Sequence, residues 1–506
     1  MQSAQRGRVF ALLLGVLAVL AGLAAVRGGF DFAKHETDML HLVDIVLRLA
    51  DGERIHQDFM TPLGLWSVAP FALLTSAGLG LGDALKWGQI GLAALLFLPA
   101  WYVAVSRMRA TWLGVAFGAA VMLLAAGLVY GGTDAKLSLS MHYNRWAWAV
   151  VFLPLALVVL PAERRVFWAE ALIIGAAMAA LTLIKATYFV AFAPAVVLGL
   201  LVRKEARLLG AAVLVGLAVL AVQTLFCGLG FWQAYVGDLL AVAASDVRPQ
   251  PGKGWAQVML SPAYAAGTLL AVGSVLWLRS KAKDNPAGLV LALMLPGAIY
   301  VSYQNYGNDP IWLVLWGIVL LVLARELRSL QIWGAVALAL IAPVAVNVGF
   351  SPVRHITQPR AAFEPVLPSD NSLRGVTARF ENPSGVWPLG EDDGSCKLHG
   401  GAVGYMRAMA RTLEAEGHAG KRVYAAGLFN TFWLFADFEP LKGGAPWYYG
   451  GLPGIEDAEL FVLPECSLKP EFKELVMREI SARQIKLEPV YQDENMAVFQ
   501  PQNASH

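Results

Sequence analysis

Hydrophobic and polar positions follow two different patterns along this chain, and the pattern changes near residue 350. Up to that point, apolar runs of about 17–25 residues recur, each long enough to cross a bilayer as an α-helix. Beyond it, "YMRAMARTLEAEG" and "KPEFKELVMREISARQ" predict helices, and "KRVYAAG", "AELFVLP" and "NMAVFQP" predict strands. We therefore predict a polytopic α-helical transmembrane domain over residues 1–350 and a small soluble α/β domain over residues 351–506.

Basic clusters separate the apolar runs at regular intervals, and short loops rich in Lys and Arg stay in the cytoplasm. If all the clusters lie on the cytoplasmic side, the chain must cross the membrane twice between successive clusters and once more at about 332–348. The predicted topology has about eleven transmembrane helices, a cytoplasmic N-terminus and an external C-terminal domain. External loops are expected near 29–86, 130–144, 185, 229–258 and 303–310. The clusters are Arg6/Arg8, Arg107/Arg109, Arg164/Arg165, Arg203/Lys204/Arg207, Arg279/Lys281/Lys283 and Arg325/Arg328.

Composition supports this division. The chain of 506 residues is 57% hydrophobic and 15% charged, with a mean hydropathy of +0.55, whereas soluble domains carry about 25% charged residues. The last 156 residues hold 15 Lys/Arg and 20 Asp/Glu, so the remaining 24 Lys/Arg and 17 Asp/Glu belong to residues 1–350. A basic membrane domain thus precedes an acidic soluble one.

The first external loop, 29–86, is unusually rich in titratable residues. Helical spacing places five polar residues on one face, which predicts an amphipathic helix on the membrane surface with a solvated polar face. The apolar stretch 62–80 follows and is expected to lie in the outer leaflet without crossing. The polar face comprises Asp38, His41, Asp44, Arg48 and Asp51.

The spacing of this loop resembles a known family. Asp38 is followed by Gly52, then by "HQDF" with Asp58, and then by "TP" and an apolar segment. This resembles the first external loop of the GT-C membrane glycosyltransferases, in the branch of the protein mannosyltransferases and the lipid A aminoarabinose and galacturonic acid transferases. The family's acidic pair is here Asp38-Met39, and its "PY" is Ile55-His56. The resemblance is closest over residues 8–200 and does not extend to the C-terminal domain.

The resemblance implies an inverting transferase that moves a sugar from a polyprenyl phosphate, such as undecaprenyl phosphate, to a glycan, lipid or protein hydroxyl. The reaction would take place at the periplasmic face of a bacterial inner membrane. Asp38 would be the catalytic base, with Asp58 nearby orienting the acceptor or binding a metal. A divalent metal ion at Asp38, Asp58 and Asp134 remains open; no other cofactor and no nucleic acid is expected. Asp58 could equally cap the following helix.

The second external loop, "YGGTDAKLSLSMHYNRWAW", adds polar candidates. A departing lipid phosphate needs positive charge, for which Arg145 and His142 are suited; Asp134 and Asn144 are predicted substrate contacts. Arg145 could instead anchor the membrane interface. Lys185 interrupts an apolar stretch and is a second phosphate-binding candidate at an outer turn.

The later sequence contributes weaker candidates. Gln304 and Asn305, in "SYQNYGNDP", could bind sugar or acceptor hydroxyls, or form a plain turn. Cys396 and Cys466 lie in the external domain, where an oxidising compartment permits a disulfide; two free buried thiols are the alternative.

Three other functions remain open, one of them a structural or sensory membrane protein whose C-terminal domain is the working part. An O-antigen ligase or polymerase would use lipid diphosphate donors, but it usually has its largest external loop later in the chain. A lipid-linked sugar transporter or flippase would place charges near the bilayer midplane, often in paired repeats. In this chain the charges gather in the outer loops and we find no repeat, which favours the transferase.

Overall fold

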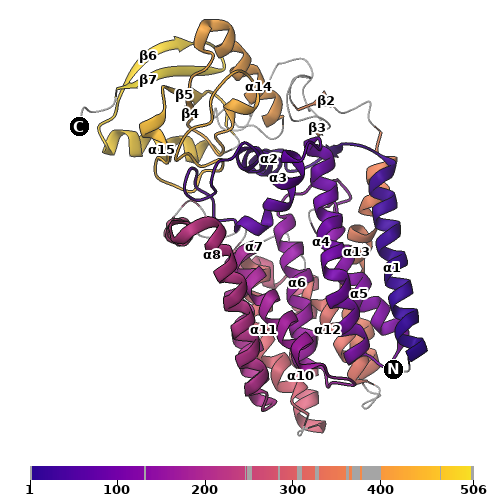
Figure 1. The fold of residues 1–506 in the computed structure, drawn as a ribbon. Coiled ribbons are helices and arrows are strands. Elements are labelled where there is room, and N and C mark those ends of the chain that lie inside the picture. Colours follow the sequence, from indigo (N-terminus) through magenta and orange to yellow (C-terminus); the bar gives the residue numbers. More distant parts are fainter. Residues whose placement is uncertain are drawn as a thin grey trace.

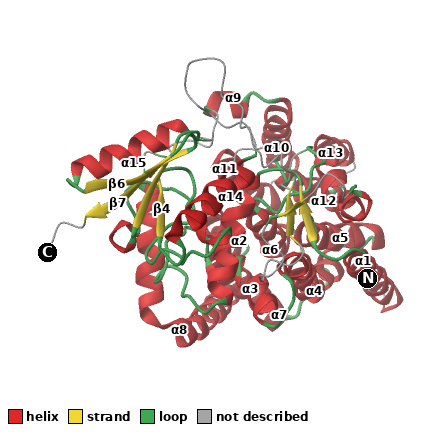
Figure 2. Ribbon diagram, turned by 90° about the horizontal axis from the view of Figure 1, so that it is seen from above, coloured by secondary structure: helices red, strands yellow, loops and turns green. Residues whose placement is uncertain are grey.

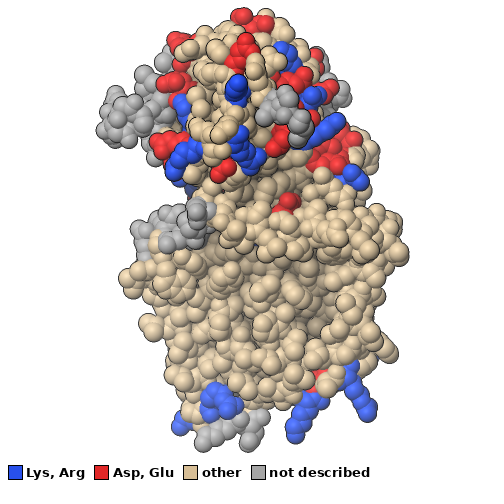
Figure 3. Space-filling model, turned by 90° about the vertical axis from the view of Figure 1, so that its left-hand side faces the viewer, with Lys and Arg blue, Asp and Glu red and all other residues tan. Residues whose placement is uncertain are grey.

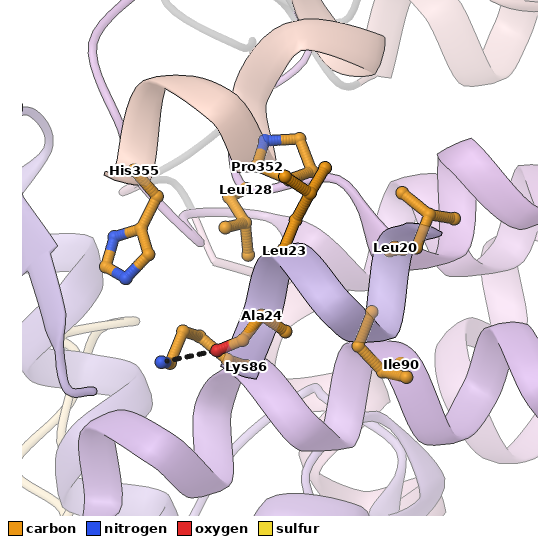
Figure 4. Close-up of a pocket in the computed structure, with 9 residues that line it drawn as sticks. Leu20, Leu23, Ala24, Lys86, Ile90, Leu128, Pro352 and His355 are labelled. Atoms are coloured by element: carbon orange, nitrogen blue, oxygen red, sulfur yellow. Dashed lines mark hydrogen bonds between the residues drawn. The ribbon is translucent and has the colours of Figure 1, made fainter. Parts of the chain in front are cut away.

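The computed structural model describes residues 3–129, 131, 133–245, 247, 254–282, 285–304, 310–324, 330–359, 364–366, 376–378, 401–467 and 469–502. A bundle of long apolar helices carries a small mixed domain at one end, while the N-terminus lies at the other (Figure 1). Side chains such as Leu225, at 85% exposure, and Leu95, at 71%, point outward from the bundle. The surface seen in Figure 3 is nearly free of charged side chains along the bundle and carries them at both ends. The fold fits a membrane-embedded helical protein.

The bundle helices differ in length. Six of those in the described ranges are long and apolar enough to cross a bilayer, whereas the sequence predicts about eleven crossings. Two more are apolar but short, and α6 and α10 carry polar residues at one end. The six are α1 (Ser3–Val26), α4 (Leu81–Arg107), α7 (Phe167–Val202), α8 (Ala206–Ala243), α11 (Ala287–Gln304) and α13 (Leu330–Thr357). The others are α5 (Thr111–Ala126), α6 (His142–Val159), α10 (Pro262–Lys281) and α12 (Trp312–Leu323), with the five-residue α9 (Trp255–Met259) before α10.

Helix α7 reverses direction at Lys185, whose extended backbone (φ −157°, ψ 102°) interrupts it. The guanidinium group of Arg165, just before α7, lies 2.8 Å from the carboxylate of Glu205, just after it. Arg203 at the end of α7 also donates to the carbonyl oxygen of Val158 near the end of α6. A straight helix of 36 residues would separate its ends by about 54 Å, so these contacts require a turn at the position where the sequence predicts one.

Helix α8 is broken at Gly228, which has a positive φ of 76° that glycine adopts readily. Its second half lies along the end of the bundle that carries the C-terminal domain, which we call the outer end for its place in the fold, because Asp238 accepts a hydrogen bond of 3.0 Å from the Thr61 amide in the first loop at that end. Ser245, just past α8, lies beside Gly450 of the C-terminal domain. Figure 1 shows α8 bending below that domain. This half occupies the start of the predicted external loop 229–258.

The first outer loop contains α2 (Glu36–Ala50), a short 3₁₀ turn (Leu65–Ser67) and α3 (Ala69–Ser76). Helix α3 has eight residues, too few to cross a bilayer, in agreement with the prediction that stretch 62–80 does not cross. Gly64 packs so tightly on the outer turn of α7 that a Cβ atom there would lie 2.1 Å from the Leu183 carbonyl oxygen. Only glycine fits this contact.

The C-terminal domain confirms the predicted α/β pattern. Its sheet has the order β4-β5-β7-β6, with β4 and β5 parallel and the other pairs antiparallel. The sequence pattern does not predict strand β6. This strand is mostly exposed and contains Pro489, so its sequence shows no clear alternation of apolar and polar residues. The elements are α14 (Ala402–Leu413), a π-helical turn (Glu414–His418), β4 (Val423–Ala425), two 3₁₀ turns (Phe432–Leu434, Ile455–Asp457), β5 (Leu460–Pro464), α15 (Pro470–Ala482), β6 (Lys486–Gln492) and β7 (Met496–Gln502).

The last helix of the bundle extends past the predicted domain boundary at 350/351. Helix α13 continues to Thr357, beyond the predicted end of the last crossing. The segment 351–400, expected to be linker and loops, also contributes two short strands, β2 (Glu364–Pro365) and β3 (Val376–Ala378). Strand β3 pairs in parallel with β1 (Phe30–Phe32) of the first outer loop. Viewed from above, this sheet and the C-terminal domain lie over different parts of the bundle (Figure 2).

Candidate functional site

The first two outer loops meet beside Asp38, a half-buried residue in the first turn of α2. The buried Ser140 hydroxyl donates a hydrogen bond of 2.7 Å to the Asp38 carboxylate. Lys34 of the first loop forms an exposed ion pair with Asp134 of the second. The structure therefore brings Asp38 and Asp134 to the same junction, where the predicted site places them.

His35 occupies this junction at the start of α2, with a left-handed backbone (φ 57°) that is unusual for a residue other than glycine. Burial lowers the pKa of the His35 imidazole; Asp38 and Asp134 act in the opposite direction, and Lys34 reinforces the lowering. The lowered pKa favours a neutral imidazole beside the Asp38 carboxylate at neutral pH.

Lys185 and Asn144 also come together. The Lys185 ammonium group donates a hydrogen bond of 2.8 Å to the side-chain oxygen of Asn144 and lies 4.9 Å from the centre of the Tyr143 ring. Asn144 is four residues after Ser140, so the segment 140–144 joins the Asp38 contact to the Lys185 contact. Four residues span at most about 14 Å, which places both groups in one region at the outer end of the bundle.

Arg145 and His142 lie elsewhere, inside the protein. Arg145 is fully buried and donates a hydrogen bond of 2.6 Å to the Gly127 carbonyl oxygen at the end of α5. Both His142 ring nitrogens face backbone carbonyl oxygens, Nε2 at 2.7 Å from Ser67 and Nδ1 at 3.2 Å from Leu139. Both residues thus contact backbone carbonyl oxygens, while Arg145 Nε and Nη2 have no hydrogen-bond partner among the described residues. Their role in binding a lipid phosphate stays a prediction.

Asp58 does not lie near Asp38, as the resemblance implies it should. Its carboxylate accepts hydrogen bonds from the Arg54 backbone amide at 2.7 Å and the Arg54 guanidinium at 2.9 Å. Phe59, next in the chain, lies beside Arg48 near the end of α2. The ten residues from position 38 to Arg48 span about 15 Å of helix. Asp58 therefore belongs to a separate cluster at the other end of α2.

The middle of the polar face of α2, from His41 to Arg48, is covered by protein, whereas the sequence predicts a solvated face. Asp44 and Arg48 form a buried ion pair at 2.7 Å, at 0% and 2% side-chain exposure. Trp433 of the C-terminal domain donates a hydrogen bond of 2.8 Å to the second Asp44 oxygen, and Arg48 also binds the Leu441 carbonyl oxygen. The C-terminal domain is docked on α2 through this pair.

The remaining candidates are dispersed or outside the described ranges. Gln304 is exposed at the end of α11, and Asn305 lies outside the described residues. Cys466 is disulfide-bonded and Cys227 is free; Cys396, the predicted partner of Cys466, also lies outside the described residues. Among the described residues, no group of three His, Cys, Asp or Glu side chains is arranged to hold a metal ion.

Sequence reasoning overlooked Ser140, His35 and Trp433. Ser140 stands in the polar run "SLSMHYN", but an uncharged hydroxyl carries little signal by itself. Trp433 lies 389 positions from its partner Asp44, and no local pattern links the two.

The fold and these contacts define a membrane-embedded helical protein whose outer loops form a polar junction beneath a docked α/β domain. No protein-family model matches the chain, and no curated protein matches it either.

Proposed function

We propose that this protein is an integral membrane glycosyltransferase. It moves a sugar from a polyprenyl-phosphate donor to a hydroxyl group of a cell-envelope glycan, lipid or protein, at the outer face of the membrane. The proposal combines the resemblance of the first outer loop to the GT-C enzymes with the contacts of Asp38. The observation that carries it is the half-buried Asp38 carboxylate, held by Ser140 where two outer loops meet.

Asp38 acts as the general base in this proposal. Its carboxylate removes the proton of the acceptor hydroxyl as the acceptor oxygen attacks the anomeric carbon, and the bond from that carbon to the donor phosphate breaks. Attack from the side opposite the phosphate inverts the configuration. The Ser140 hydroxyl, which donates to one Asp38 oxygen, restrains the carboxylate and leaves the other oxygen for the acceptor. Lys185, joined to the same segment through Asn144, supplies positive charge on the donor side.

The metal alternative does not fit one common site. Asp58 is engaged by Arg54 at the far end of α2, while Asp134 pairs with Lys34 near Asp38. Because the three predicted carboxylates do not converge, we assign them no shared role in binding a metal ion.

Transfer in proteoliposomes tests the proposal, with a polyprenyl-phosphate sugar donor and isolated envelope acceptors. Asp38→Asn keeps the shape and removes the base, so transfer should fall about 10²–10⁴-fold, while Ser140→Ala should lower it less. Asp51→Asn, at an exposed position just past the other end of α2, is the matched control and should retain most activity. Near wild-type transfer by correctly folded Asp38→Asn would overturn the assignment of the base.

The topology proposed with this function has eleven crossings. Each half of α7, the first half of α8, and α5, α6, α10 and α12 cross, together with α1, α4, α11 and α13. The breaks at Lys185 and Gly228 then lie at the outer ends of crossings, which favours a transferase over a transporter with broken helices at the midplane.

Cysteine labelling tests this topology in a Cys227→Ala background. An impermeant reagent should label an exposed cysteine at position 488 from outside intact cells, and should leave one at position 281 unlabelled. Labelling of position 281 from outside, or protection of position 488, would reverse the assignment.

A further inference from the structure

The break in α7 creates a helix start at the outer end of the bundle. Lys185 is the one residue with extended backbone inside α7, and the second half of the helix continues to Val202. This half-helix of about 17 residues has its positive dipole end at Lys185, and helix N-termini favour anions. A helix start alone does not identify a ligand, so the side chains around it decide the question.

Two fully buried side chains at this helix start have hydrogen-bond donors without an acceptor. The Asn144 side chain is 0% exposed; its oxygen is bound to the Lys185 ammonium group, while its Nδ2 group has no hydrogen-bond partner. The Tyr188 hydroxyl, one helical turn after Lys185, is also buried; the Trp148 indole N–H can donate to its oxygen, whereas its own proton has no acceptor among the described residues. Buried donors are almost always paired in native proteins, so two unpaired ones beside a cation indicate a missing acceptor.

The surrounding groups favour an anionic acceptor. The amide Nδ2 group, the hydroxyl and the ammonium group are all donors, and the positive helix end adds to the same potential. The Lys185 ammonium group lies among these donors through its contacts with the Asn144 oxygen and the Tyr143 ring. A phosphate oxygen satisfies such a set, because phosphate combines negative charge with several acceptor positions.

The position of the site favours a phosphate attached to a lipid. Residues 185–187 are half-buried, and the helix then presents Phe189 and Val190 outward at 37% and 65% exposure. An apolar surface directly beside the helix start suits the hydrocarbon chain of an amphiphile. Trp148 packs against Tyr188 with ring centres 5.2 Å apart and forms an aromatic wall.

The geometry points to the break in α7 as the binding site for the phosphate of a lipid carrier, held by Lys185, Asn144, Tyr188 and the start of the second half-helix. This inference rests on the proposed function for the identity of the lipid as a polyprenyl phosphate. The site accounts for the two unpaired donors.

Binding of polyprenyl phosphate to the full-length protein in nanodiscs tests the inference by native mass spectrometry. Polyprenol and inorganic phosphate are the comparison ligands. Tyr188→Phe removes one hydroxyl and should weaken polyprenyl phosphate binding about tenfold. Asn144→Asp replaces a donor by a carboxylate and Lys185→Met removes the cation; each should weaken binding about 10–100-fold. Lys185→Arg should retain most of the affinity.

Thr182→Val is the matched control, because this half-buried hydroxyl binds only its own helix, at Met178, and affinity should not change. Unchanged affinity in Tyr188→Phe, Asn144→Asp and Lys185→Met, each shown to be folded by its elution profile, would overturn the site. Polyprenol binding as tightly as polyprenyl phosphate would also overturn it. Inorganic phosphate binding as tightly as the lipid would overturn the assignment to a lipid carrier.

The binding assay involves no sugar transfer, so the two proposals fail separately. If Asp38→Asn transfers sugar normally while the Lys185 variants lose lipid binding, the base is wrong and the phosphate site stands. If Asp38→Asn is inactive while the Lys185, Asn144 and Tyr188 variants bind lipid normally, the phosphate site is wrong and the base stands.

Discussion

Substitution of Asp44 by Ala should loosen the C-terminal domain from the bundle. Asp44 accepts from Arg48 on its own helix and from Trp433 across the interface, and its removal leaves a guanidinium group at 2% exposure. Breaking a buried ion pair by removing one partner costs about 3–5 kcal/mol. Glu53 still contacts Arg48 at 3.0 Å, so we expect the low end, about 3 kcal/mol.

Hydrogen exchange in nanodiscs measures this cost directly, because two backbone hydrogen bonds cross the same interface. The Met60 amide donates to the Gly444 carbonyl oxygen at 2.9 Å, and the Gly443 amide donates to the Asp58 carbonyl oxygen at 2.8 Å. A loss of about 3 kcal/mol in docking should accelerate exchange at both amides roughly 100-fold. Glu439→Ala, which removes an exposed ion-pair partner in the same domain, should leave their exchange unchanged.

A double variant separates a buried charge from a simple packing defect. Replacing Asp44 by Leu and Arg48 by Met together removes both charges while keeping most of the volume, and such replacements are often neutral or stabilising. Exchange at the two interface amides should then return toward the wild-type rate. Wild-type exchange in Asp44→Ala would refute the reasoning, as would a double variant that exchanges as fast as the single one.

Three further predictions concern the outer surface. Burial lowers the pKa of His35, so the stability that the neutral imidazole contributes is complete above the ordinary histidine pKa and is lost as the pH falls below that value. Thermal melting as a function of pH should show this loss of stability, and His35→Asn should abolish the pH dependence. Gly64→Ala should abolish the folded yield measured by size-exclusion chromatography, because its Cβ atom would overlap the Leu183 carbonyl oxygen; a normal yield would show that the two segments can separate. Non-reducing peptide mapping should recover Cys396 linked to Cys466, and free thiols at both would refute the pairing.

Local sequence patterns predicted the elements that depend on nearby residues. The length of the apolar runs indicated the membrane helices, and the regular Arg and Lys clusters placed an outer turn at Lys185. The pairing of Arg165 with Glu205 and the extended backbone at Lys185 agree with that turn. In the C-terminal domain, alternation and turn residues located β4, β5 and β7, whereas the exposed edge strand β6 carried no such signal.

The amphipathic helix shows where local reasoning stops. Its 3.6-residue period placed Asp44 and Arg48 on one polar face, but periodicity does not tell whether water or protein covers that face. Trp433, 389 positions away, decides it by binding Asp44. The same limit applies to Arg145, whose charge suggested a phosphate contact but whose position beside the Gly127 carbonyl oxygen only the structure shows.

By itself, the sequence determined the class of protein and the positions of most membrane helices and of strands β4, β5 and β7, while the family resemblance of the first loop singled out Asp38 as a catalytic candidate. These follow from hydropathy, charge bias and short-range spacing, which depend on neighbouring residues. Only the tertiary structure decided which polar groups meet: it joined Asp38 to Ser140 and Lys185 to Asn144, and it bound Asp58 to Arg54 at the other end of α2 from Asp38. Such contacts depend on how distant helices pack, and packing is a property of the whole chain that no local pattern records.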